Sequence, residues 1–163
     1  MKNNYIMQFP DGTEVTTELS KTQIPDINME GLSGSELKEA CKKLFNNLGW
    51  KIKQDSIVKM ESGIFEPDII LQINGKDCGY VEVITSYEQQ DIIDKQEVVK
   101  AIIDECKPRV FVLTNGKVFD IFYDGIFSCT QSLPPTMEDV ERHERLSAYL
   151  KSLMKIKEDE SNE

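Results

Sequence analysis

The stretch EPDIILQINGKDCGYVEVIT, residues 66–85, decides the fold. It holds two short apolar runs, 67–73 and 78–85, on either side of Asn74-Gly75, a dipeptide that is typical of a hairpin turn. Each run carries one acid, Asp68 near the start of the first and Glu82 within the second. We therefore expect two antiparallel strands that each present a carboxylate.

The register of this hairpin decides whether the two acids can meet, because side chains alternate between the two faces of a strand. A strict two-residue turn pairs Asp68 with Val81 and puts the acids on opposite faces. A turn with a bulge at Gly75 pairs Asp68 with Tyr80, and Glu82 then lies on the same face, one step along. A shared site for the two acids therefore predicts a bulged turn.

Two carboxylates on neighbouring strands can bind one hard divalent cation, because Mg2+ prefers oxygen ligands and needs few of them from the protein. Such a cation can activate a water molecule and stabilise the charge that develops on a phosphodiester. Glu36, on a preceding helix, is a candidate for a third oxygen ligand, and it equally fits a capping box with Ser33. Asp68 also fits a plain strand start after Pro67, whereas Glu82 needs a partner because burying an unpaired charge is costly.

The rest of the sequence predicts one α/β domain with a mixed sheet. We expect an N-terminal hairpin and loop (1–32), a core (33–131), a C-terminal helix (132–157) and a frayed, charged tail (158–163). The core is expected to run helix, three antiparallel strands, helix, two strands. The expected core elements are helices at 33–48 and 88–106 and strands at 50–60, 67–73, 78–85, 109–114 and 117–123, with a further strand at 127–131.

The stretch 33–122 resembles the PD-(D/E)xK nuclease-like N-terminal domain of the restriction (R) subunits of type I restriction enzymes and related stand-alone proteins. The matching features, in order, are Glu36 on a first helix that ends Leu48-Gly49-Trp50, then Pro67-Asp68, Val81-Glu82, Gln96, and the strand 111–116 that ends Leu-Thr-Asn-Gly. The resemblance implies a restriction-endonuclease-like core, Mg2+ or Mn2+ dependence, and cleavage of DNA backbones in defence. It implies Glu36, Asp68 and Glu82 as metal ligands and Gln96 as a further site residue.

One position departs from the family pattern. The motif lysine stands two residues after the glutamate, and this chain has Ile84 there. An aliphatic side chain can neither carry charge nor bind a water, and losing one such electrostatic group costs roughly a hundredfold or more in rate. Lys95 or Lys100, on the helix after Glu82, is the candidate replacement. Lys100 also stands where related nucleases often carry a tyrosine four residues after Gln96.

The composition of the chain limits which functions and locations fit it. The net charge is −10, whereas DNA binders normally offer basic surface. Residues 36–136 hold 16 acids and 12 bases, a net of −4, so the flanks supply the remaining −6. The four cysteines are scattered without a CxxC pair, and no apolar run approaches membrane-spanning length. We therefore expect a cytoplasmic protein with reduced thiols and no membrane partner.

Three functions remain open from sequence. The first is a Mg2+-dependent DNA endonuclease domain in which Asp68 and Glu82 hold the metal and Lys95 or Lys100 replaces the motif lysine. The second is a catalytically inactive nuclease fold that serves binding or assembly, which Ile84 and the acidic charge favour. The third is an acidic interaction protein that mimics DNA. The chain has no GxxxxGK[ST] pattern, so a translocase, if one acts with it, is a separate defence-system subunit.

Overall fold

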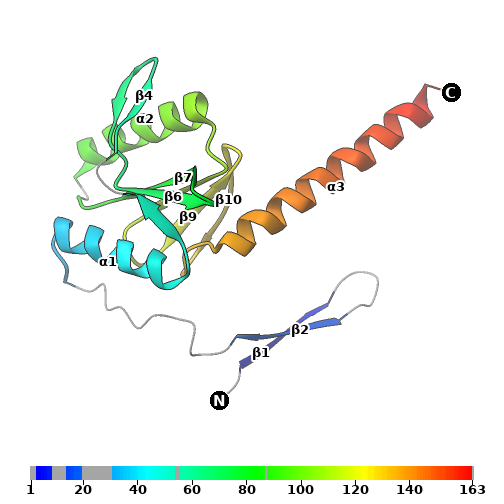
Figure 1. The fold of residues 1–163 in the computed structure, drawn as a ribbon, viewed down its shortest axis with the longest axis horizontal. Helices are drawn as coiled ribbons and strands as arrows, with labels where there is room; N and C mark the ends of the chain where they lie inside the picture. Colours follow the sequence, from blue (N-terminus) through cyan, green and yellow to red (C-terminus); the bar gives the residue numbers. More distant parts are fainter. Residues whose placement is uncertain (1–2, 9–13, 20–30, 54–55, 87, 163) are drawn as a thin grey trace.

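The computed structural model describes residues 3–8, 14–19, 31–53, 56–86 and 88–162. Its centre is a six-stranded mixed sheet in the order β10-β9-β8-β7-β6-β3 (Figure 1). The strands are β3 Lys51–Lys53, β6 Ile69–Ile73, β7 Lys76–Val83, β8 Val110–Thr114, β9 Phe119–Tyr123 and β10 Ile126–Gln131. Every neighbouring pair is antiparallel except β7 and β8, which are parallel and are connected through a helix, as parallel strands require. The predicted α/β class with a mixed sheet is confirmed, and the architecture is compatible with a restriction-endonuclease-like core.

Two helices cover the two faces of the sheet (Figure 1). α1, Gly34–Asn47, packs Leu37, Cys41 and Leu44 against one face, in the core cluster that includes Val81 and Val83. α2, Gln89–Cys106, packs Val99 and Ile102 against Phe111 on the other face. Successive residues of β8 alternate between the two clusters, as strand geometry requires. The core therefore consists of two apolar layers separated by one sheet.

The hairpin of β6 and β7 differs from its predicted form. Asn74 and Gly75 have φ of 52° and 76° and make a tight two-residue turn in which Ile73 pairs with Lys76. The register then shifts by one between Gln72↔Asp77 and Leu71↔Gly79, so the bulge lies at Cys78, inside β7. The prediction of a bulge at the turn was wrong, because Asn-Gly readily supplies the two positive φ angles of a tight turn.

Other predicted boundaries also moved. The strand predicted at 50–60 is not continuous, since its second half forms β4, Val58–Met60, and pairs with β5, Gly63–Phe65, in a separate hairpin. Phe65 explains this hairpin, because its ring packs edge-on against Tyr80 in the cluster beneath α2. At the N-terminus β1, Asn3–Gln8, pairs with β2, Glu14–Leu19, as predicted. The turn expected at 10–12 and residues 20–30 of the expected loop lie outside the described residues.

The C-terminal helix α3, Met137–Ser161, is longer than predicted and includes most of the tail that was expected to fray. Thr136 caps it through Asp139, and the neighbouring Pro135 carbonyl accepts a hydrogen bond of 2.8 Å from the buried Trp50 indole. Figure 1 shows α3 leaving the sheet and projecting away from it. Among the described residues no helix combines the length and apolar character needed to cross a membrane.

Candidate functional site

Asp68 and Glu82 lie opposite one another at one end of the β6–β7 hairpin. Ile69 pairs with Val81, and the same register continued by one step brings Asp68 to Glu82. The Asp68 backbone N–H donates to Glu82 Oε1 at 3.2 Å, and the Val83 N–H donates to Asp68 Oδ2 at 2.8 Å. The bulge at Cys78 produces this register, so the two acids meet despite the tight turn.

Lys95, on α2, reaches both acids. Its amine bonds Glu82 Oε2 and lies 3.8 Å from Asp68 Oδ2. Lys100, the other candidate, is exposed. Among the described residues, the amines that pair with Asp68 or Glu82 belong to Lys38 and Lys95 and not to Lys100. The structure therefore places Lys95, and not Lys100, beside the two acids.

Lys38, on α1, is a site residue that sequence reasoning missed. Its amine lies 2.9 Å from Asp68 Oδ1, and it comes from the helix that covers the opposite face of the sheet from α2 (Figure 1). The one signal in the sequence is its position one helical turn before Lys42, which puts two basic side chains in one row of the helix. Nothing in the sequence says that this row faces Asp68, because that follows from how α1 packs on the sheet.

The electrostatics of the cluster follow from burial. The side chains of Glu82 and Asp68 are only 4% and 10% exposed, and two lysines balance their two charges. Burial raises the pKa of Glu82, the adjacent charge of Asp68 raises it further, and Lys95 opposes both effects. The hydrogen bond to Asp68 raises the pKa of Lys38, with burial acting against it. The cluster is thus paired and close to neutral overall.

Glu36 has the capping role that the sequence allowed. Its carboxylate accepts the Ser33 backbone N–H at 3.2 Å and completes the capping box of α1. Within the described part of the chain no three His, Cys, Asp or Glu side chains form a group that could hold a metal. Asp68 and Glu82 are the two acids that the β6–β7 hairpin brings into contact.

These two acids fit a hard divalent cation. Mg2+ is often held by one or two carboxylates and keeps several waters, so a third acid is not required. The carboxylates are buried, adjacent, and already fixed by backbone N–H groups, which limits the entropy lost when they bind a cation. The feature that opposes cation binding is that lysine amines already pair with these carboxylates, Lys38 with Asp68 Oδ1 and Lys95 with Glu82 Oε2.

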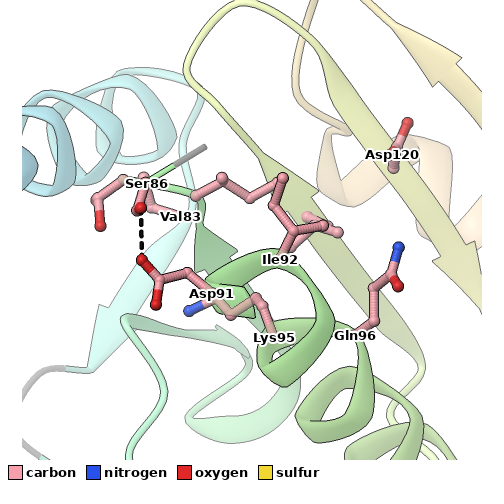
Figure 2. Close-up of a pocket in the computed structure, with 10 residues that line it drawn as sticks. Val83, Ser86, Asp91, Ile92, Lys95, Gln96 and Asp120 are labelled. Carbon is pink, nitrogen blue, oxygen red and sulfur yellow. Dashed lines mark hydrogen bonds between the residues drawn. The ribbon is translucent and has the colours of Figure 1, made fainter. Parts of the chain in front are cut away.

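A pocket of about 380 Å3 lies on the α2 side and shares Lys95 with the acid cluster, although neither Asp68 nor Glu82 lines it (Figure 2). Lys95, Ile92 and Gln96 line it from the helix, and Ile84 lines it from the segment after β7. Ser86 donates to Asp91 at 2.6 Å at its rim. Gln96 is exposed and lies beside the pocket, where it can meet a ligand. Ile84 thus gives the pocket an apolar wall.

Comparison with family models and with curated proteins gives no match. Solved structures do match, and one of them is described as the cryoEM structure of a DrdV–DNA complex. The identity is 17% and the TM-score 0.48, over 68% of this chain. This chain spans 11% of the length of that protein.

Proposed function

We propose that this chain is a Mg2+-dependent endonuclease-like domain that acts on DNA phosphodiester bonds. The observation that carries the proposal is the convergence of Asp68, Glu82 and Lys95 at one end of the β6–β7 hairpin. Metal-assisted phosphodiester hydrolysis needs carboxylates to hold the cation and a positive group beside them, and two buried carboxylates next to one amine supply both. The resemblance of residues 33–122 to type I restriction R-subunit domains supports DNA as the substrate.

Each residue has a separate task in this proposal. Asp68 and Glu82 would hold the cation, which supplies an activated water and charge stabilisation when bound. Lys95 would keep its amine beside the reacting phosphate and offset negative charge there, the task of the motif lysine. Gln96 and the pocket wall at Ile84 would contact the nucleotide next to the cleaved bond. A DNA translocase or another defence-system subunit would be a separate protein.

A specific observation favours a second candidate, an inactive nuclease fold used for binding or assembly. Lys38 and Lys95 already neutralise both acids, so the cluster is stable without a metal. A chain that has lost catalysis could keep such ion pairs for stability alone. The acidic DNA-mimic reading has less support at this site, because Asp68 and Glu82 are buried and paired.

The experiment that separates the two candidates measures metal binding and cleavage together. We expect Mn2+ binding by calorimetry and nicking of plasmid DNA with Mg2+ or Mn2+ for the wild type. Asp68→Asn and Glu82→Gln should each lose both, with cleavage falling about a hundredfold or more. Glu97→Gln, an exposed acid on α2, is the matched control and should change neither. Wild-type protein that neither binds Mn2+ nor cuts DNA would establish the inactive fold instead.

A further inference from the structure

Lys38 and Lys42 lie one turn apart on α1 and both line a groove next to Asp68. The groove has a volume of about 350 Å3, and Glu66 and Pro67 lie in its wall. Lys42 pairs with Glu39 at 2.9 Å, and the Lys38 side chain is 41% exposed. The groove is therefore open to solvent at Lys38 and reaches Asp68, one of the two candidate metal ligands.

The contact of Lys38 conflicts with metal binding at Asp68. Asp68 Oδ2 accepts the Val83 N–H and faces Lys95, whereas Oδ1 is bonded to Lys38 at 2.9 Å. A divalent cation that takes Oδ1 would occupy the place of the Lys38 amine, whereas Lys95 bonds Glu82 and lies 3.8 Å from the other oxygen of Asp68. Like charges within a few ångströms repel, so the cation and the Lys38 amine exclude one another at Oδ1. Lys38 must then leave Asp68. Its flexible stem and partial exposure allow it to turn into the groove.

We propose that Lys38 is a phosphate-binding residue that changes partners with the state of the metal site. Without a divalent cation it pairs with Asp68, and with a cation bound it contacts a backbone phosphate of a DNA strand lying in the α1 groove. Lys42 contacts a neighbouring phosphate in either state, because its ion pair is with Glu39 and not with a metal ligand. This inference rests on the proposed function, since it requires a cation at Asp68 and DNA as the ligand.

The test measures DNA affinity with and without a cation. Fluorescence anisotropy with a labelled duplex is run over a salt series, in EDTA and in Ca2+, which takes the same oxygen ligands. Lys38→Met should leave affinity unchanged in EDTA, weaken it in Ca2+ by about fivefold or more, and reduce the salt slope there by about 1. Lys42→Met should weaken binding in both conditions. Lys43→Met, an exposed lysine on the same helix, is the control and should change neither.

Calorimetry gives an independent measurement that needs no DNA. Because Lys38 competes with the cation, Lys38→Met should bind Ca2+ more tightly than the wild type, whereas Lys43→Met should not. The partner exchange is overturned if Lys38→Met loses DNA affinity equally in EDTA and in Ca2+, or if it changes DNA affinity in neither condition. It is also overturned if Lys38→Met binds Ca2+ with the same affinity as the wild type. Failure of the wild type to bind Ca2+ at all would overturn both this inference and the proposed metal site. Normal Ca2+ binding without any effect at Lys38 would overturn the inference alone.

Discussion

Glu82 shows how single residues set the charge of the site. Burial raises its pKa, Asp68 adds to the rise, and the Lys95 amine holds it down. An acid whose pKa is higher in the folded state than in the unfolded state reduces stability once the pH exceeds its unfolded pKa. The ion pair with Lys95 keeps this cost small by favouring the charged form. Lys95 therefore supports the fold as well as any chemistry.

This dual role predicts that Lys95→Met is destabilising in a pH-dependent way. Without the amine the pKa of Glu82 rises further, so the cost of its charge grows with pH. We expect the free energy of unfolding to fall by about 1–3 kcal/mol at pH 8 and by less at pH 5, because a raised pKa leaves Glu82 more protonated at the lower pH. Urea denaturation followed by the fluorescence of Trp50, the single and buried tryptophan, measures this difference.

Two variants make the interpretation specific. Lys100→Met removes an exposed lysine from the same helix and should change stability little at either pH. Adding Glu82→Gln to Lys95→Met should recover much of the loss at pH 8, because the unpaired charge is gone. The same loss at pH 5 and pH 8 would mean that Lys95 acts through packing alone.

At the scale of elements, β7 explains what the sequence could and could not predict. Strand type, the Asn-Gly turn and an acid on each strand follow from residues 66–85 alone. The position of the bulge does not, because it depends on how β7 packs against β8. Gly79, next to the bulge, lies so close to β8 that a Cβ there would be 2.2 Å from the Val110 carbonyl oxygen. The contacts of Lys38 and Lys95 with the acids likewise depend on how the helices pack. Sequence spacing alone therefore left Lys95 and Lys100 as equal candidates for the lysine role and gave Lys38 no role.

The close approach at Gly79 predicts that Gly79→Ala is strongly destabilising. The added methyl group must push backbone against backbone at the centre of the sheet, where Gly79 pairs with Val110. We expect a loss of about 2–3 kcal/mol or more in the free energy of unfolding, at the upper end of overpacking effects. Lys76→Ala, on the same strand but exposed, should change stability by less than about 0.5 kcal/mol. Gly79→Ala with wild-type stability would show that the two strands can separate without cost.

At the scale of the whole molecule, α3 has a docked part and a free part. In the docked part Val140 is buried, His143 stacks on Tyr123 with ring centres 4.4 Å apart, and Glu144 accepts two hydrogen bonds from Arg109 at 2.6 and 2.9 Å. From residue 148 onward every described side chain is exposed. The exposed apolar side chains of the helix are Leu146, Tyr149, Leu150, Leu153, Met154 and Ile156. This end of the helix is held by its own hydrogen bonds, and helices without tertiary packing are marginal in water.

Hydrogen exchange tests this division along α3. Backbone amides of residues 150–160 should exchange at least about tenfold faster than those of residues 140–146, because the side chains of 150–160 are exposed, whereas Val140 is buried in the described structure. Amides of the buried strand β8 provide the protected reference within the same sample, and a dilution series checks for association. The prediction is contradicted if amides of residues 150–160 are as protected as those of residues 140–146 at high protein concentration and lose that protection on dilution. Such a result would mean that a second copy of the chain covers the apolar side chains.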